Sequence, residues 1–126
     1  VYETTFGGAV SETLSMDVNV LQLCTYSIDM RDSYGDGWNG ASVDINFTGG
    51  ADIATVSFDG PATSAAVETF SVPAGYEMTV TFNSGAWDSE VAYAIFSNET
   101  ASGAPIFFDT PPVTVGVAYT GTAVCP

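Results

Sequence analysis

Apolar and polar side chains alternate along most of the chain, which is the pattern of a β-strand with one buried face. The segment Leu14–Val20 is the most regular, because a polar side chain follows each of its first three apolar ones. The alternation recurs over residues 24–30, 43–47, 54–58, 67–72, 78–82, 91–95, 106–108 and 113–119. The sequence shows no convincing apolar stripe with a period of 3.6 residues, so it predicts an all-β protein.

Turn-forming residues separate these runs, among them Gly49-Gly50, Asp59-Gly60-Pro61 and Pro111-Pro112. Short strands spaced every ten or so residues predict an antiparallel β-sandwich, Ig-like or jelly-roll, and the pattern does not choose between the two topologies. We expect two parts: residues 1–23, an N-terminal strand segment, and residues 24–126, the sandwich domain.

The two cysteines, Cys24 and Cys125, stand near opposite ends of the chain. In a small acidic chain, two distant cysteines are typical of an extracellular protein with one disulfide; two buried free thiols are the alternative. The chain begins with Val1 rather than Met, so we expect a mature or trimmed form of a secreted protein. No apolar run reaches the ~18 residues of a spanning helix, so we expect no membrane span.

The charge balance excludes several classes of function. Fifteen acidic residues stand against one basic residue, Arg31, and the net charge is −14. Such a chain is not expected to bind nucleic acid or an anionic membrane surface. Without histidine it has no Ser-His-Asp relay and no imidazole metal site, and without lysine it forms no Schiff base. We therefore expect a protein that is not an enzyme, although sites for hard cations remain.

The densest local signal is the loop Asp-Ser-Tyr-Gly-Asp-Gly-Trp-Asn-Gly at residues 32–40. Its glycines permit a tight curl, and its carboxylate, amide and carbonyl oxygens suit Ca²⁺. It does not fit an EF-hand, because Tyr34 and Val43 fill positions that require acidic residues there. The alternative is a loop held by Asx-turns, with Trp38 closing the edge of the sandwich. The candidate calcium ligands are Asp32, Asp36, Asn39, Asp88 and Glu90.

The strand Cys-Thr-Tyr-Ser-Ile-Asp-Met at residues 24–30, followed by DSYGDGWNGASVDI, resembles a β-rich module that recurs in secreted bacterial proteins. In that module a cysteine-bearing strand leads into such a loop, a glutamate follows a later Gly-rich turn, and a cysteine ends the unit. Glu90 and Cys125 stand at the matching places, so the resemblance covers residues 24–125. It implies secretion and a sandwich fold, but no particular activity.

Candidate carbohydrate chemistry takes two forms. Asn46 and Asn98 lie in N-glycosylation patterns, although chance matches are common in a Thr-rich chain. A sugar-stacking platform is the second form, with core packing of the same aromatic side chains as its alternative; its candidates are Tyr34, Trp38, Tyr76 and Trp87. Glycosidase chemistry by a pair from Asp36, Asp88 and Glu90 is disfavoured, because a small sandwich offers no evident deep cleft.

The function we expect rests on the segment before Cys24, whose apolar side chains lie on one face of a strand. Such a strand either folds into its own sandwich or completes that of a neighbour. The second choice predicts a homo-oligomeric helical filament, built head-to-tail by a donor strand as in bacterial pili, which this architecture resembles. The alternative is a secreted, calcium-dependent module that binds glycans or mediates adhesion. The candidate donor-strand residues are Leu14, Met16, Val18 and Val20.

Overall fold

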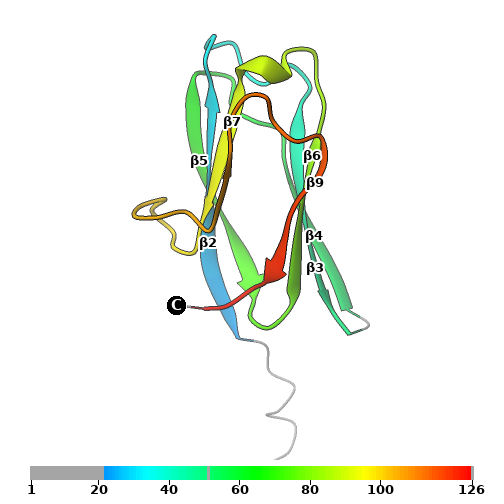
Figure 1. Ribbon diagram of the computed structural model, residues 1–126. Helices are drawn as coiled ribbons and strands as arrows, with labels where there is room; N and C mark the ends of the chain where they lie inside the picture. The colour runs from blue at the N-terminus through cyan, green and yellow to red at the C-terminus, as the bar shows by residue number, and fades with distance from the viewer. Residues whose placement is uncertain (1–21, 51, 126) are drawn as a thin grey trace, which may run out of the picture.

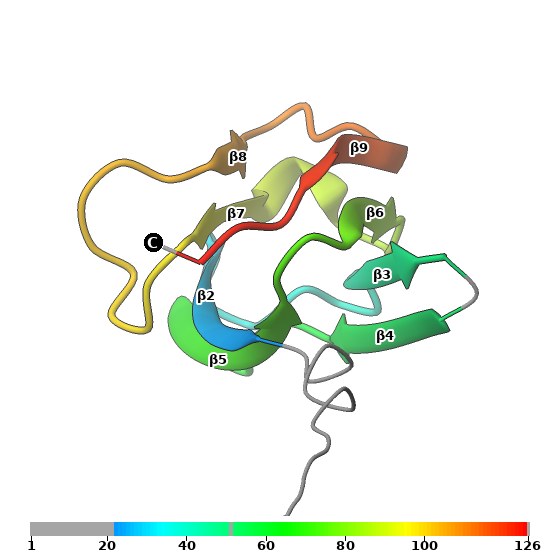
Figure 2. The ribbon, with the colours of Figure 1, turned by 90° about the horizontal axis from the view of Figure 1, so that it is seen from below.

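The computed structural model describes residues 22–50 and 52–125, which form a two-layer sandwich (Figure 1). Its eight strands are β2 (Leu23–Asp32), β3 (Ser42–Gly49), β4 (Asp52–Phe58), β5 (Ala65–Pro73), β6 (Glu77–Asn83), β7 (Val91–Phe96), β8 (Phe107–Asp109) and β9 (Gly116–Thr122). A short 3-10 helix, η2 (Asp88–Glu90), precedes β7. One layer has the order β5-β2-β7-β8 and the other β4-β3-β6-β9, with every neighbouring pair antiparallel. Seen end-on, β4 and β5 lie on one side and β8 and β9 on the other (Figure 2).

The predicted β-sandwich is confirmed, and each of the eight alternating runs after residue 23 overlaps a strand. The strands divide into four and four, which differs from the four and three of a constant-type immunoglobulin domain. The connections β3–β4 and β7–β8 stay within a layer, and the others cross between layers. The predicted strand Leu14–Val20 lies outside the described residues. Within the described ranges, no helix is long and apolar enough to cross a membrane.

The core lies between the layers and is built from the apolar positions of the alternating runs. On β2, for example, Tyr26, Ile28 and Met30 are at most 1% exposed. The largest core side chain from outside the alternating runs is Trp38, which comes from the loop after β2 and is equally buried. Its ring makes edge contacts with Phe82, and its Nε1 donates a hydrogen bond to the carbonyl oxygen of Arg31 at 2.8 Å. The loop therefore supplies the largest side chain of the core.

The last strand departs from the prediction of a continuous alternating strand over residues 113–119. β9 begins at Gly116, and the valines at 115 and 117 are both exposed. A bulge explains Val117: Val80 faces Tyr119 while Thr81 faces Val117, so that Ala118 is an extra residue. One extra residue reverses the face of every side chain beyond it. The alternating pattern therefore predicts the buried face of this strand correctly on only one side of the bulge.

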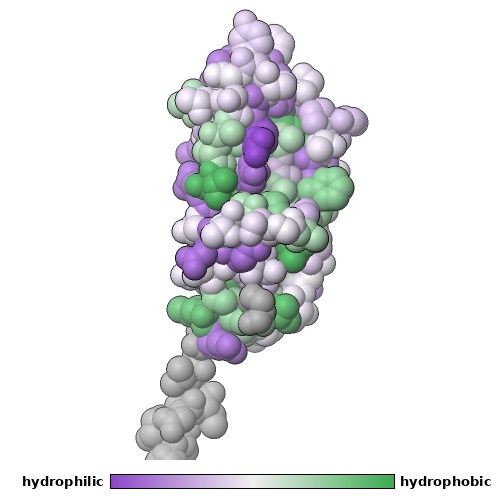
Figure 3. Space-filling view, turned by 90° about the vertical axis from the view of Figure 1, so that its left-hand side faces the viewer, coloured by the Kyte–Doolittle hydropathy of each residue, from purple (hydrophilic) through white to green (hydrophobic). Residues whose placement is uncertain are grey.

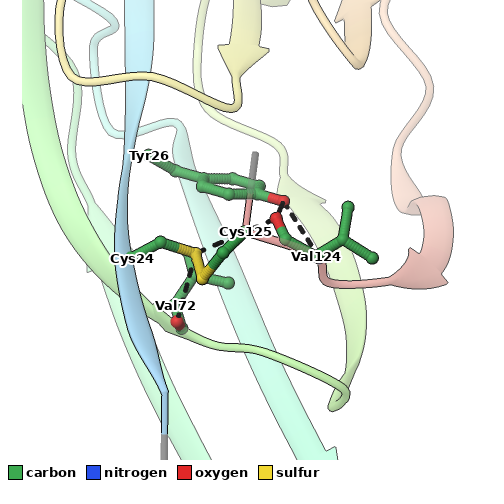
Figure 4. Close-up of a disulfide and its surroundings, with 5 residues drawn as sticks. All are labelled: Cys24, Tyr26, Val72, Val124 and Cys125. Carbon is green, nitrogen blue, oxygen red and sulfur yellow. Dashed lines mark hydrogen bonds between the residues drawn. A yellow bond between two sulfur atoms is a disulfide. The ribbon is translucent and has the colours of Figure 1, made fainter.

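The predicted disulfide is confirmed between Cys24 and Cys125, whose Cα atoms are 5.5 Å apart (Figure 4). Cys24 lies near the start of β2, in one layer, and Cys125 follows β9, in the other. Beside the bond, the Tyr26 hydroxyl donates to the carbonyl oxygen of Val124 at 2.6 Å and accepts from the backbone N–H of Val124 at 3.2 Å. The C-terminal segment is therefore fastened to β2 by a covalent bond and by hydrogen bonds.

Candidate functional site

Two segments meet at the end of the sandwich opposite the disulfide (Figure 1). They are residues 33–41, after β2, and residues 84–90, before β7, and together they are called the loop end here. The backbone N–H of Ser33 donates to the Glu90 carbonyl oxygen, and that of Ala86 donates to the Asn39 carbonyl oxygen, both at 3.0 Å. These bonds fix the two segments against each other, so their side chains hold defined relative positions.

Asp32 organises the first segment through its carboxylate, which accepts from the backbone N–H groups of Gly35 at 2.9 Å and Gly37 at 2.7 Å. Both glycines have positive φ angles, near +90°, that let the backbone turn back on this carboxylate. A Cβ at Gly37 would also collide with the carbonyl oxygen of Pro61. Burial of Asp32 disfavours its charge, but backbone N–H groups, that of Gly37 foremost, outweigh burial and lower its pKa. Asp32 is therefore a buried, ionised carboxylate.

Asp32, Asp36 and Glu90 form a carboxylate cluster, in which one oxygen from each residue lies within 4.8 Å of the others. Asp32 is buried, Asp36 is exposed and Glu90 is half-buried. One Glu90 oxygen, Oε1, is buried and has no hydrogen-bond partner among the described residues. Burial, followed by the charges of Asp36 and Asp32, raises the pKa of Glu90. The cluster thus concentrates negative charge: Asp32 is satisfied by backbone N–H groups, whereas Glu90 Oε1 has no donor among the described residues.

The chain's one basic residue does not neutralise this cluster. Arg31 instead pairs with Asp29 on the outer face of the β5-β2-β7-β8 layer, through two bonds of 2.6 and 2.9 Å. On that face, a hydrophilic column lies between hydrophobic areas (Figure 3). The oxygen ligands of the cluster match the chemistry that a hard divalent cation requires.

The other two predicted ligands behave differently. Asn39 touches the rim of the cluster, since its side-chain amide donates to Asp36 Oδ1 at 3.2 Å and to the Gly37 carbonyl oxygen at 3.1 Å. Asp88 is held in its own turn, where its carboxylate accepts from Ser84 Oγ at 2.5 Å and from the backbone N–H of Gly85 at 2.7 Å. The structure thus brings Asp32, Asp36 and Glu90 together and assigns Asp88 to the shape of the second segment.

Two of the four aromatic side chains proposed for sugar stacking are exposed at the loop end. Tyr34 is 76% exposed and Trp87 is 56% exposed. Trp38 instead belongs to the core, and the half-buried Tyr76 packs against that core, beside Gly49. The loop end therefore combines a carboxylate cluster with one exposed aromatic ring on each of its two segments.

The two glycosylation patterns differ in how firmly the asparagine is held. Asn46 is partly exposed on β3, and its amide nitrogen donates to Thr55 Oγ1 at 2.9 Å. Asn98 is tied into a turn: its Oδ1 accepts from the backbone N–H groups of Thr100 and Ser102, and its amide nitrogen donates to the Ser102 carbonyl oxygen. Attachment of glycans to either residue stays a prediction.

The side of the sandwich between β4 and β5, called the open side here, was not predicted from the sequence. Ala54 pairs with Phe47, Val56 with Ile45, and Glu68 with Ile28. These three partners are buried, so Ala54, Val56 and Glu68 are also directed toward the interior. Even so, Ala54 and Glu68 are exposed and Val56 is half-buried. The opposite side is closed by the Phe107 and Tyr119 rings, whose centroids are 5.2 Å apart.

Comparisons with known proteins find no matching family model, no similar curated protein and no similar solved structure.

Proposed function

We propose that the protein is the subunit of an extracellular filament, in which the N-terminal strand Leu14–Val20 of one copy completes the sandwich of the next. The open side is the observation that carries this proposal. Residues 23–50 and 52–125 supply two four-stranded layers and a packed core, yet interior-directed positions on β4 and β5 remain accessible at the open side. Both are edge strands within the described residues, and unpaired edges accept an added strand.

The energetics of the N-terminal strand favour such an addition. Four apolar side chains on one face of Leu14–Val20 would contribute about 6–12 kcal/mol at most if they were fully buried. A strand passed head-to-tail makes a heterologous contact, and repetition of that contact gives an open helical filament instead of a closed oligomer. The disulfide stabilises the receiving sandwich independently of this strand, because it joins β2 to the C-terminal segment.

The filament proposal predicts that the full-length chain polymerises and that the apolar face of its N-terminal strand is required. The double variant Met16→Asp/Val18→Asp should abolish filaments in negative-stain images and leave single subunits in sedimentation. The matched control is Ser15→Asp/Asn19→Asp, which adds the same charge to the polar face and should still polymerise. A wild-type chain that stays monomeric at millimolar concentration would contradict the proposal.

The loop end favours a second candidate function, a secreted calcium-dependent module for carbohydrate binding or adhesion. Ca²⁺ would be held by Asp32, Asp36 and Glu90, with the side chain or carbonyl of Asn39 at its rim. An exposed cation can bind sugar hydroxyls, and an aromatic ring such as that of Trp87 suits the apolar face of a pyranose. The two functions are compatible, because the loop end and the open side are different parts of the surface.

The calcium proposal predicts opposite effects of Glu90→Gln with and without the ion. In EDTA, wild-type Glu90 has a raised pKa, so its ionisation costs stability as the pH rises from about 4.5 through that pKa and at every higher pH. Glu90→Gln should therefore raise the melting temperature at pH 7 in EDTA. In calcium, the same variant should gain less from the ion than the wild type, because one ligand oxygen carries no charge.

The matched control for this test is Glu99→Gln, which removes one negative charge from the exposed 97–105 loop. It should leave the calcium-dependent shift in melting temperature unchanged. Equal wild-type melting temperatures in calcium and in EDTA, together with no bound metal by elemental analysis, would contradict the calcium proposal.

A further inference from the structure

We propose that the edge of β4, and not the edge of β5, receives the strand Leu14–Val20 of a second copy. This inference rests on the proposed filament function and specifies its contact. Both edges border the open side, so they compete for the same incoming strand (Figure 2). The choice between them follows from the side chains that each edge directs toward the interior.

The β5 edge is blocked by Glu68. Its pairing with Ile28 directs the glutamate toward the interior, where an added strand would cover it with apolar side chains. The Glu68 carboxylate has no hydrogen-bond or ion-pair partner within residues 22–50 and 52–125, and covering such a carboxylate is costly. Inward-directed charges are a known device by which edge strands resist pairing. The chain's one arginine is bound to Asp29, on the outer face, so it does not compensate this charge.

The β4 edge carries no such obstacle in its middle. Over residues 53–58 its interior-directed side chains are Ala54, Val56 and Phe58, and the one charged residue of the strand, Asp52, stands at its end beside the turn. Its length also fits, because β4 has seven residues, as does the segment Leu14–Val20. Ile53 is 71% exposed on the outer face of this strand. An added strand would therefore cover apolar surface along residues 53–58 of β4 without burying a charge within that stretch.

The hydrogen-bonding groups of β4 also face the right way. Gly49 pairs with Asp52 across a two-residue turn, and such a closing pair exchanges both of its backbone hydrogen bonds. Since bonded and non-bonded pairs alternate along an antiparallel ladder, the backbone N–H and C=O groups of Ile53, Thr55 and Ser57 point away from β3. They are available to an incoming strand.

The chain's own N-terminal strand cannot reach this edge, because the connection between Val20 and β2 is too short. A strand added beyond β4 would lie about 14 Å from β2, given about 4.8 Å between neighbouring strands and about 10 Å between layers. Val20 is three peptide steps from Leu23, and three steps span at most about 11 Å. The strand on β4 therefore comes from a second copy.

The experiment compares two full-length variants that change one charge each at interior-directed edge positions. Ala54→Glu places on β4 the obstacle that Glu68 forms on β5, and it should abolish filaments under conditions in which the wild type is fully polymerised. Glu68→Ala removes the obstacle from β5 and should leave the filaments unchanged. Thr55→Pro is a second β4 variant; it removes an outward N–H group and should also abolish assembly. Circular dichroism and melting of the resulting monomers confirm that each variant is folded.

The outcomes separate this inference from the filament proposal itself. If the wild type polymerises and folded Ala54→Glu and Thr55→Pro polymerise equally well, the β4 assignment is overturned while the filament stands. If Glu68→Ala instead abolishes filaments, β5 is the receiving edge. If the wild type is monomeric, the filament proposal fails. In that case the melting temperature of Thr55→Pro is compared with that of a variant with proline at the same depth in β5. A lower melting temperature of Thr55→Pro would place the strand on β4 of its own subunit, and would overturn the inference that the strand comes from a second copy.

Discussion

Loss of the Cys24–Cys125 disulfide is expected to lower the free energy of unfolding by about 4–5 kcal/mol. The bond closes a loop of 101 residues, nearly the whole sandwich, and so removes a large share of the conformational entropy of the unfolded chain. It also joins β2 to the segment after β9, and these two strands belong to different layers. Urea unfolding of the oxidised chain and of the Cys24→Ala/Cys125→Ala variant measures this difference directly.

A second variant separates the covalent contribution from the hydrogen bonds beside it. Tyr26→Phe keeps the disulfide but removes the hydroxyl that bonds to Val124, and it should cost about 1 kcal/mol. If the double alanine variant lowers the free energy of unfolding no more than Tyr26→Phe does, the disulfide does not stabilise the fold by restricting the unfolded chain. The C-terminal segment is then held by its hydrogen bonds alone.

The strands could be predicted because each of them has one face on a continuous core. An alternating pattern such as that of Val43–Phe47 specifies both a strand and the face that it buries. The pattern fails where a local irregularity changes the face. At Ala118 the bulge in β9 turns Val117 outward, and nothing in the alternation of valines signals this extra residue.

The candidate site could be predicted only in part, because its residues come from two segments far apart in the sequence. Asp32 and Asp36 share one loop, so their proximity follows from the sequence. Glu90 and Asp88 are two residues apart, and the sequence does not decide which faces the first loop. The structure decides it through the 84–88 turn, in which Asp88 accepts hydrogen bonds from Ser84 and Gly85. Glu90 is then left beside Asp36.

The open side was missed for a related reason. Glu68 interrupts the apolar positions of the 67–72 run, and this was the available signal. A single acidic residue in a strand is usually outward-facing, however, and only the register with Ile28 shows that Glu68 is directed toward the interior. Strand pairing of this kind depends on the topology, which the sequence pattern leaves open between sandwich types.

Asp32→Asn is expected to lower the free energy of unfolding by about 2–3 kcal/mol at pH 7 in EDTA, and by more in calcium, where the variant also weakens a proposed ligand of the ion. One carboxylate oxygen accepts from both Gly35 and Gly37, and an uncharged amide oxygen accepts these bonds more weakly. The amide's own N–H groups cannot replace the lost acceptor, because the groups that face this side chain are backbone N–H donors. Because the folded pKa of Asp32 is lowered, its contribution is present above about pH 3.9 and is lost as the pH falls through the folded pKa. The difference between variant and wild type should therefore shrink in acid.

Asp36→Asn is the matched comparison, because it makes the same chemical change four residues away, at an exposed position of the same cluster. Its carboxylate accepts only from the Asn39 side chain among the side-chain bonds described, so the loop does not depend on it. In EDTA, Asp36→Asn should leave the melting temperature unchanged or raise it, since it removes a charge that disfavours ionised Glu90. In calcium, it should reduce the stabilisation by the ion. If Asp32→Asn is instead as mild as Asp36→Asn in EDTA, the buried carboxylate does not hold the turn, and the glycines with positive φ angles shape the loop without it.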